Sequence, residues 1–286
     1  MKPPYVTSEA LDQFIKQAFL EDVGEGDHST LASVPEDATD SAKIVLKEDG
    51  VIAGLELAEL IFKKLDPDSK IDFKKKDGEK GRSGDIILTI SGNARSILTA
   101  ERIVLNCLQR MSGIAAKSAR ASEILKNTQT RILDTRKTTP CFRMCEKWAV
   151  HIGGGKNHRY GLFDMIMLKD NHIAFSGGIQ KAIENTLGYL KDIDRKIKIE
   201  IETSSIEEVK EVINVGGVDI IMLDNMDVET MTKCVDLINN KYVTEASGGI
   251  SEEDLLKVAS SGVDYISMGA LTHSAGIIDI SLKALV

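Results

Sequence analysis

The feature that most constrains the fold is a regular alternation of strand-like and helix-like segments, which begins near residue 130 and continues almost to the C-terminus. The strand-like segments are short apolar runs, and the segments between them repeat apolar residues every three or four positions. The expected strands cover residues 130–134, 163–172, 196–202, 218–224, 242–247 and 263–270, the last being the final strand, and the expected helices cover 140–150, 179–190, 205–215, 229–240 and 251–261. Strands that are joined by helices pair in parallel. The pattern therefore predicts an α/β barrel, complete or incomplete, or an open doubly wound sheet.

The residues at the strand ends favour the barrel. Every expected strand closes on polar, charged or glycine residues at its carboxyl end, which is where barrel enzymes keep their active sites. In an open sheet the ligand-binding residues gather at one switch point instead. No GxGxxG motif follows any strand, so a nicotinamide cofactor is not expected. The residues at these ends are Thr135, Arg136, Lys137, Lys169, Glu202, Asp224, Ser247, Gly248, Gly249, Met268 and Gly269.

The first third of the chain mixes element types and predicts a separate small α+β domain. Its expected elements are a helix over 11–23, a strand over 41–50 that runs into a turn, a helix over 54–65, two strands within 70–94 and a long helix over 94–125 that could break near Ser112 and Gly113. We therefore predict one domain over residues 1–115 and a barrel domain over 116–274, with residues 275–286 able to pack on the first domain.

Composition restricts the class of protein. The chain has 286 residues, is 42% hydrophobic and carries a formal charge of -8, which argues against a nucleic-acid surface. It lacks a run of about 18 apolar residues that would predict a membrane span. Its N-terminus lacks a signal-peptide pattern, so a cytoplasmic location is expected. The four cysteines form no CxxC pair and are expected to be free thiols.

Basic residues gather in one segment of this acidic protein. Residues 131–172 hold eight cations and four acids. Arg136, Lys137 and Lys169 sit where strands end, so the barrel predicts that they converge in a pocket for a polyanion. Salt bridges at the barrel rim are the alternative. Arg143 and Lys147 lie on an expected helix and are interpreted as solvated charges.

The same segment holds three of the five histidines. The residues alone leave His158, next to Arg159, open between a structural and a functional role, while His151 and His172 are interpreted as structural. The triple glycine 153–155 is expected to turn the chain sharply after a helix.

Two carboxylates are expected side by side at the carboxyl ends of neighbouring strands. In the alternating segment 196–202, Glu200 and Glu202 share a face. Glu202 lies at the strand end, and Asp224 ends the next strand. Such a pair could bind Mg²⁺, hold ribose hydroxyls or stabilise a developing positive charge. Structural ion pairing with the nearby cations is the alternative.

Small-residue loops follow the last two expected strands. One loop contains Ser247, Gly248 and Gly249, and the other follows Ser267. Loops of this kind let backbone N–H groups approach a phosphate, and barrels often bind phosphate after their last two strands. The sequence therefore predicts at least one phosphate site.

These motifs together resemble the quinolinate phosphoribosyltransferase family, also called nicotinate-nucleotide pyrophosphorylases. The resemblance spans nearly the whole chain and involves no departure at the motif positions. The matching stretches are ERIVLN (101–106), QRMSGIA (109–115), DTRKTTP (134–140), GGGKNHRYGLFDMIMLKDNHI (153–173), IEIE (199–202), LDN (223–225), EASGGI (245–250) and ISMGALTHSA (266–275).

The resemblance implies a fold and an activity. The implied fold is an N-terminal α/β sandwich followed by an incomplete α/β barrel. The implied reaction joins quinolinate to 5-phosphoribosyl-1-pyrophosphate with Mg²⁺ and yields nicotinate mononucleotide, pyrophosphate and CO₂ in NAD biosynthesis. The implied assembly is a homodimer or a hexamer of dimers with a shared active site, without nucleic-acid or membrane partners.

The resemblance also assigns residues. Lys137, Lys169, Glu202 and Asp224 are implied to be catalytic, and Glu202 and Asp224 to face Mg²⁺ through substrate and water. Arg102 is implied to reach the site of the neighbouring subunit. The implied substrate-binding residues are Arg102, Thr135, Arg136, Lys137, His158, Arg159, Lys169, Glu202, Asp224, Ser247, Gly248, Gly249, Ser267, Met268, Gly269 and His273.

Three other hypotheses stay open. A paralogue of the same fold could act on another acidic acceptor, although retention of Arg136, Lys137, Arg159 and Lys169 argues against it. A non-catalytic sensor could bind the sugar phosphate without turnover. A barrel isomerase with the same phosphate loops is a weaker alternative, because it does not require so many cations.

Overall fold

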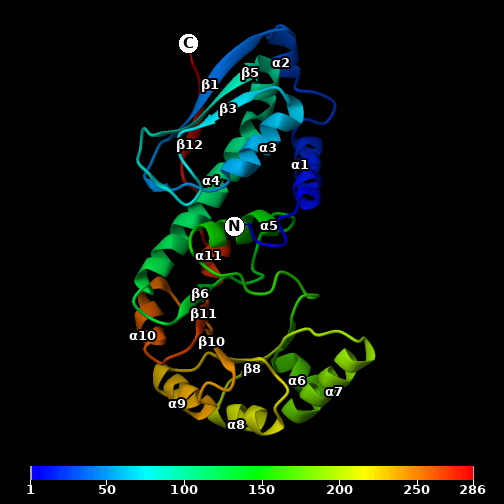
Figure 1. Ribbon diagram of the computed structural model, residues 1–286, viewed down its shortest axis with the longest axis vertical. Helices are drawn as coiled ribbons and strands as arrows, with labels where there is room; N and C mark the ends of the chain where they lie inside the picture. Colours follow the sequence, from blue (N-terminus) through cyan, green and yellow to red (C-terminus); the bar gives the residue numbers. More distant parts are fainter. Residues whose placement is uncertain (1, 286) are drawn as a thin grey trace. The chain divides into compact units, whose positions relative to one another are not determined.

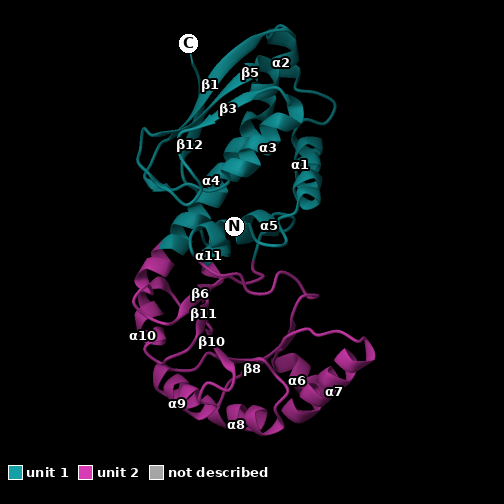
Figure 2. Cartoon of the chain, viewed as in Figure 1, with its two compact units in different colours: residues 1–119, 138–154, 271–286 teal, residues 120–137, 155–270 magenta. Residues whose placement is uncertain are grey.

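The computed structural model describes residues 2–285, which form two compact units. Unit 1 comprises residues 1–119, 138–154 and 271–286, and unit 2 comprises residues 120–137 and 155–270 (Figure 2). The sequence predicted a boundary near residue 115, followed by one continuous barrel domain. The units of the structure interleave instead, because the segment 138–154 belongs with the N-terminal part.

Unit 1 is built on a four-stranded antiparallel sheet. Its strand order is β12 (Ile280–Ala284), β1 (Thr39–Leu46), β5 (Ile86–Asn93) and β3 (Lys70–Phe73), and the short strands β2 (Gly50–Val51) and β4 (Lys80–Gly81) pair separately. The prediction that 263–270 is the final strand is wrong, because β12 follows it and pairs with β1. Its partner lies more than two hundred residues upstream, so local periodicity could not show the pairing.

The helices of unit 1 are mostly amphipathic, as their spacing predicted. They are α1 (Ser8–Asp22), α2 (His28–Ser33), α3 (Leu55–Leu65), the greater part of α4 (Ala94–Ile124), α5 (Arg143–Ile152) and most of α11 (Ala270–His273). The short helices α2 and α11 were not among the expected helices. Figure 1 shows α3 and α4 beside the sheet. The fully buried side chains of Ile44, Leu57, Ile61, Leu88 and Leu108 form part of the core between these elements.

Helix α4 continues through the point where a break was expected. The hydroxyl of Ser112 accepts a hydrogen bond from the backbone N–H of Ala53 at 3.0 Å. A Cβ added to Gly113 would lie 2.0 Å from the backbone oxygen of Gly276. The small residues therefore serve close packing against neighbouring segments and do not interrupt the helix.

Helix α5 differs from its prediction in two respects. It begins at Arg143 and not at Pro140. Lys147 is fully buried, whereas it was expected to be a solvated surface charge. The reason is that α5 is covered on nearly all sides, since every residue from Met144 to Val150 is buried.

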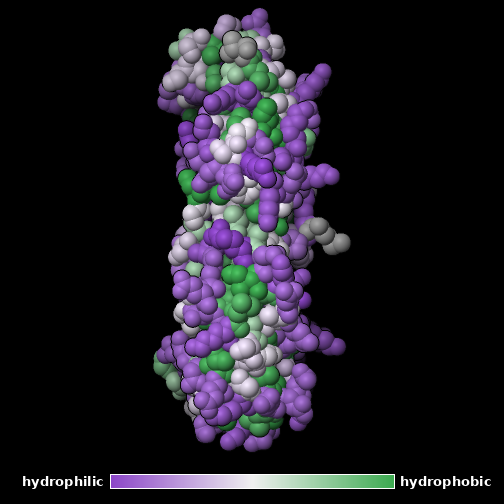
Figure 3. Space-filling model, turned by 90° about the vertical axis from the view of Figure 1, so that its left-hand side faces the viewer, coloured by the Kyte–Doolittle hydropathy of each residue, from purple (hydrophilic) through white to green (hydrophobic). Residues whose placement is uncertain are grey.

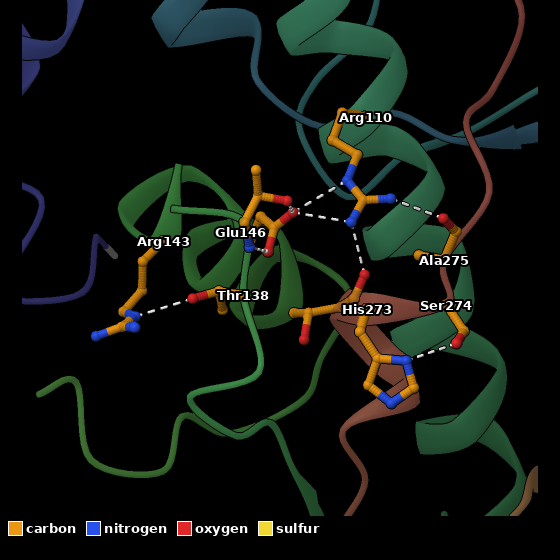
Figure 4. A network of polar contacts seen from close by, with 9 residues as sticks. Arg110, Thr138, Arg143, Glu146, His273, Ser274 and Ala275 are labelled. Carbon is orange, nitrogen blue, oxygen red and sulfur yellow. Dashed lines mark hydrogen bonds and ion pairs between the residues drawn. The ribbon is translucent and has the colours of Figure 1, made fainter. Parts of the chain in front are cut away.

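A buried ion pair joins the three segments of unit 1. The carboxylate of Glu146, which is fully buried, accepts hydrogen bonds from Nε and Nη2 of Arg110 at 3.0 and 2.8 Å and from the hydroxyl of Thr139 at 2.9 Å (Figure 4). The same guanidinium donates to the backbone oxygens of Thr272 and Ala275. This network explains why residues 138–154 and 271 onward pack with α4.

Unit 2 contains a six-stranded parallel sheet with the order β6 (Arg131–Leu133), β11 (Tyr265–Ser267), β10 (Val243–Ser247), β9 (Ile220–Asp224), β8 (Ile199–Thr203) and β7 (Ile166–Leu168). Helices α7 (Ile179–Asp192), α8 (Ile206–Val215), α9 (Val228–Ile238) and α10 (Leu255–Ala259) lie outside the curved sheet (Figure 1). Within residues 2–285, the edge strands β6 and β7 do not pair with each other. The prediction of an incomplete α/β barrel is confirmed.

Two expected strands are shorter in the structure. The segment 163–172 forms a strand only over Ile166–Leu168, and Asp170 begins helix α6 (Asp170–Ser176). The segment 263–270 forms a strand over Tyr265–Ser267, and Ala270 begins helix α11 (Ala270–His273). Strand β7 ends where its apolar run ends, before Lys169, whereas β11 ends at Ser267, before the Met268–Gly269 connection to α11.

The face of the molecule drawn in Figure 3 is mostly hydrophilic, as the composition of the chain predicts. On the face drawn in Figure 3, hydrophilic residues cover most of the surface and hydrophobic residues form separate groups. Among residues 2–285, every helix falls short of the length and apolarity that a membrane crossing requires.

Candidate functional site

The carboxyl ends of the six parallel strands bring most of the predicted site residues to one edge of the unit 2 sheet. The strands run in register, with Ser267 beside Leu133, Ser247 beside Asp224 and Thr203 beside Leu223. Residues at the ends of parallel neighbouring strands lie on the same edge. The residues placed at or just beyond this edge are Thr135, Arg136, Lys137, Lys169, Glu202, Asp224, Ser247, Gly248, Gly249, Ser267, Met268 and Gly269.

One loop is fastened to the end of β6 by a buried carboxylate. Asp134 is fully buried, and it accepts hydrogen bonds from the backbone N–H of His158 at 2.8 Å and from the side-chain amide of Asn157 at 2.7 Å. The backbone of Lys156 adds two bonds to β6, through Ile132 and Asp134. The position of the His158–Arg159 pair is therefore set by β6.

The triple glycine 153–155, which precedes this loop, turns the chain sharply after α5, as expected. Gly154 has a φ of +88°, which glycine adopts without strain. A Cβ on Gly153 would lie 2.4 Å from the backbone oxygen of Ala115 in helix α4. The chain therefore turns sharply after α5, and it does so in close contact with α4.

Two guanidinium groups lie within electrostatic range of each other. Burial, followed by the positive charge of Arg136, lowers the pKa of Arg159, while Glu200 and Asp164 act in the opposite direction. The Arg159 side chain is oriented by a hydrogen bond of 3.0 Å from Nη1 to the backbone oxygen of Met165. Paired guanidiniums of this kind suit an anion that carries carboxylates.

Lys169 forms an ion pair with Glu202. Its Nζ lies 2.9 Å from Oε2 of Glu202, and the two side chains are 47% and 15% exposed. The Nδ1 atom of His172 accepts a hydrogen bond from the backbone N–H of Lys169 at 3.0 Å. His172 therefore has a structural role, and the ion-pair alternative is observed for Lys169 and Glu202. An exposed pair contributes at most about 1 kcal/mol, so a substrate anion can replace the carboxylate at low cost.

Glu202 and Asp224 lie on neighbouring strands, as the sequence predicted. Glu202 is in register with Met222, so Asp224 is two residues further towards the carboxyl edge. Oδ2 of Asp224 accepts a hydrogen bond from the side-chain amide of Asn225 at 2.6 Å. The two carboxylates are thus staggered along the edge.

The loop after β10 requires glycine. Gly248 and Gly249 have φ values of +103° and +59°. A Cβ on Gly248 would lie 2.2 Å from Oδ1 and 2.8 Å from the backbone nitrogen of Asn225. The backbone N–H of Asn225 in turn donates to the oxygen of Ser247 at 2.9 Å. The loop is tightly packed against the end of β9, and its backbone is suited to close approach of a phosphate.

The ring of His158 faces two buried acids, whereas the resemblance implies that His158 binds substrate. Its Nε2 lies 2.8 Å from Oε2 of Glu200 and 3.4 Å from Oε2 of Glu245, and its Nδ1 accepts the backbone N–H of Arg159. Burial by itself lowers the pKa of His158, but the two carboxylates outweigh this effect and raise it. Burial raises the pKa of Glu200 to about 7. The imidazole ring therefore points towards the buried carboxylates of Glu200 and Glu245.

Sequence reasoning missed three members of this arrangement. Asp134, Glu200 and Glu245 are buried, with exposures of 0%, 0% and 1%. Glu200 was noted only for the face that it shares with Glu202. The available signal was a charged residue within an apolar strand, since such a residue is rarely buried without a partner.

Two predicted site residues belong to unit 1. Arg102 is an exposed residue of α4. His273, on α11, is also exposed, and its Nδ1 lies 2.6 Å from the hydroxyl of Ser274 (Figure 4). The remaining predicted site residues belong to unit 2.

Comparison with known proteins gives consistent matches. Residues 27–112 match the model of the quinolinate phosphoribosyl transferase N-terminal domain, and residues 114–283 match that of its C-terminal domain. The chain is 45% identical to a mitochondrial quinolinate phosphoribosyltransferase [decarboxylating] of Nicotiana tabacum, over 99% of this chain and 84% of that protein. It is 41% identical to a probable nicotinate-nucleotide pyrophosphorylase [carboxylating] of Bacillus subtilis, over 95% and 92%. The crystal structure of NadC from Streptococcus pyogenes superposes with a TM-score of 0.91 at 40% identity, over 98% and 99% of the two chains.

Proposed function

The chain belongs to the quinolinate phosphoribosyltransferase family, and we propose that it transfers the phosphoribosyl group of 5-phosphoribosyl-1-pyrophosphate to quinolinate with loss of CO₂. The products are nicotinate mononucleotide and pyrophosphate, so the enzyme is a pentosyltransferase of NAD biosynthesis. The observation that carries this proposal is the meeting of cations, paired carboxylates and a glycine phosphate loop at one edge of the unit 2 sheet.

The cations account for recognition of quinolinate. Quinolinate carries two adjacent carboxylates, whose desolvation needs several positive charges. Arg136 and Arg159 influence each other electrostatically, and Lys169 needs only to exchange Glu202 for a substrate carboxylate. In the proposal, these residues together with Thr135, Lys137 and the loop of His158 orient the ring so that its nitrogen faces the ribose.

The ends of β10 and β11, which lie between β6 and β9 in the sheet, account for recognition of the phosphoribosyl donor. In the proposal, the loop of Ser247–Gly249 offers backbone N–H groups to phosphate oxygens. Ser267–Gly269, at the end of the neighbouring strand, line the same site, although the N–H of Met268 is bonded to the backbone oxygen of Leu133. As pyrophosphate leaves, the ribosyl carbon gains positive charge, and the carboxylates of Glu202 and Asp224 stabilise it electrostatically. The ring nitrogen then forms the new bond to that carbon.

Decarboxylation follows from the charge on the ring. Once its nitrogen is quaternary, the ring can accept the electron pair that remains when CO₂ leaves the neighbouring carbon, and this carbon then takes up a proton. In the proposal, Lys137 and Lys169 stabilise the electron-rich ring through their positive charges.

A magnesium ion fits the donor atoms at this edge. Mg²⁺ in phosphate-transfer sites is bound by one or two carboxylates together with substrate phosphates and water. Glu202 and Asp224 offer such carboxylates, staggered on neighbouring strands. When bound, the ion would neutralise the charge that develops on the leaving pyrophosphate.

We further propose that the enzyme acts as a dimer or an assembly of dimers. Arg102 and His273 belong to unit 1, whereas the remaining residues of the site belong to unit 2. In the proposal, Arg102 completes the quinolinate pocket of a neighbouring subunit.

The test is a product assay with purified protein. We expect nicotinate mononucleotide, pyrophosphate and CO₂ in equal amounts, formed only when quinolinate, 5-phosphoribosyl-1-pyrophosphate and Mg²⁺ are all present. Activity with nicotinate but not with quinolinate would contradict the proposal. Binding of 5-phosphoribosyl-1-pyrophosphate without turnover would favour the alternative hypothesis of a non-catalytic sensor.

A variant of the cation cluster sharpens this test. Lys169→Ala should weaken quinolinate binding by about tenfold or more, because it removes a charge from the pocket. The free energy of unfolding should change by no more than about 1 kcal/mol, because the lost ion pair is half exposed. Unchanged quinolinate affinity would show that Lys169 is not part of the quinolinate pocket.

A further inference from the structure

A cluster of three titratable side chains lies inside the unit 2 sheet, beneath the edge that carries the proposed site. Glu200 is the second residue of β8 and Glu245 the central residue of β10, and both are almost completely buried. The side chain of His158 is 7% exposed and faces both carboxylates. The proposed reaction uses neither glutamate, so their presence needs a reason.

The contacts of His158 leave its ring fully engaged. Nε2 faces Glu200 at 2.8 Å and Glu245 at 3.4 Å, and Nδ1 accepts the backbone N–H of Arg159 at 2.8 Å. Nε2 carries a proton, and this N–H points to the glutamates. The carboxylate of Asp134 accepts a hydrogen bond from the backbone N–H of His158. His158 is therefore an anchor that fixes the residue next to it in the chain, Arg159.

Stability does not explain this cluster. Oε1 of Glu200 and Oε1 of Glu245 are buried without a hydrogen-bond partner, and Oε2 of Glu245 has only the 3.4 Å ion-pair contact with Nε2 of His158. One imidazole cannot compensate two buried carboxylates, and an apolar replacement of a buried ionic group is often neutral or stabilising. Such costly polar groups are found where function requires them.

The charges of the cluster act on the proposed anion site. The positive charge of Arg136 disfavours the charged form of the Arg159 guanidinium, whereas the negative charge of Glu200 favours it. Glu200 thus supplies negative charge to Arg159, one of two cations that must stay together before a substrate anion arrives. Removing this charge should allow the two guanidiniums to separate.

We propose that Glu200 and Glu245 are positioning residues of the anion site: both hold His158 within the barrel and fix Arg159 through it, and Glu200 also offsets the repulsion between Arg136 and Arg159. This inference rests on the proposed function for the identity of the anion, quinolinate. Neither glutamate touches the substrate, and both act through His158 and Arg159.

The experiment compares Glu200→Gln and Glu245→Gln with the wild-type enzyme. The dissociation constants of quinolinate and of 5-phosphoribosyl-1-pyrophosphate are measured separately by calorimetry, and the melting temperature is measured by circular dichroism. We expect quinolinate binding to weaken about tenfold in Glu200→Gln and about threefold in Glu245→Gln, as for other residues that orient a binding group. Affinity for the sugar phosphate should stay within about twofold, and the melting temperature should be equal or higher.

Glu211→Gln is the matched control, because it makes the same chemical change at an exposed position of α8. It should leave both affinities unchanged. If Glu200→Gln does not fold, Glu245→Gln decides the question, since it keeps the shorter bond between His158 and Glu200.

Three results would overturn the positioning role. They are unchanged quinolinate affinity in both variants, equal weakening of both substrates together with a lower melting temperature, and a stoichiometric metal ion bound by the three side chains in the purified wild-type enzyme. A wild-type enzyme that does not bind quinolinate would overturn the proposed function itself, so the two failures are distinguishable.

Discussion

Asp134 and Glu200 show how single buried carboxylates prepare an exposed anion site. Asp134 holds the loop of His158 against β6, and Glu200 holds the imidazole of the same residue from β8. The two acids fix one loop from two different strands. Arg159, which follows His158, is therefore placed with little freedom, and such pre-organisation lowers the cost of binding.

The cluster should also make stability depend on pH. The Glu200 carboxyl has a pKa of about 7 in the folded chain, against an ordinary value of 4.5. Between these values the folded chain holds more protons than the unfolded chain, so Glu200 makes stability fall as pH rises. Gln does not titrate, and Glu200→Gln should therefore gain stability relative to the wild-type protein from pH 4.5 to 7, by at most about 1.4 kcal/mol per pH unit.

Urea denaturation at several pH values, followed by circular dichroism, measures this difference. Glu211→Gln serves again as the control and should follow the wild-type curve. Parallel curves for Glu200→Gln and the wild type would mean that Glu200 ionises normally.

At the scale of elements, the parallel strands decide which residues meet. Each strand is short, three to five residues in the cases of β7 and β8, yet all six deliver their carboxyl ends to one edge. The strand–helix rhythm was sufficient to predict this edge. It was not sufficient to predict that β7 ends at Leu168, because the turn into α6 depends on the bond between His172 and the Lys169 backbone.

The loop after β10 gives a prediction at this scale. Gly248→Ala places a Cβ against Asn225 at a φ of +103°, so the loop must move away from β9. We expect a loss of about 1–3 kcal/mol in the free energy of unfolding. Binding of 5-phosphoribosyl-1-pyrophosphate should weaken more than binding of quinolinate, and calorimetry measures both.

Gly84→Ala is the matched control for backbone strain. Gly84 has a φ of +92°, and a Cβ there has open space around it. This variant should lose a similar strain energy but keep its affinity for the sugar phosphate. Equal affinities in the two variants would argue against a phosphate role for the Gly248 loop.

At the scale of the whole molecule, the chain is divided into two interleaved units. The segment 138–154 leaves unit 2 and returns to it, and the ion pair of Arg110 and Glu146 holds it within unit 1. The candidate site residues are divided in the same way, with Arg102 in unit 1 and Lys169 in unit 2.

A mixing experiment tests whether neighbouring subunits share a site. Arg102→Ala and Lys169→Ala should each be nearly inactive alone. If Arg102 acts in the neighbouring subunit, a mixed dimer of the two variants contains one intact site. Random subunit exchange should then restore about a quarter of the wild-type activity.

Activity is measured by pyrophosphate release after the subunits have been exchanged. Each variant taken through the same exchange alone is the control. Activity that does not rise on mixing, in dimers shown to have exchanged, would place Arg102 and Lys169 in the same subunit's site.

The sequence by itself determined the fold class and the edge at which the site residues meet. The reason is physical: apolar periodicity is local, and the parallel pairing of strands joined by helices follows from it. The cations at the strand ends and the glycine loops could therefore be named by residue number before any coordinates were known.

Only the tertiary structure decided which buried groups support these residues. The contacts of His158 with Glu200 and Glu245, the pairing of β12 with β1 and the burial of Lys147 all join segments that are distant in the chain or depend on how an element is covered. Local patterns carry no information on such partners. The sequence around a charged residue in a strand or helix is the same whether its side chain faces water or another charge. Packing determines which it faces, and with it the ionisation of Glu200 and the placement of Arg159.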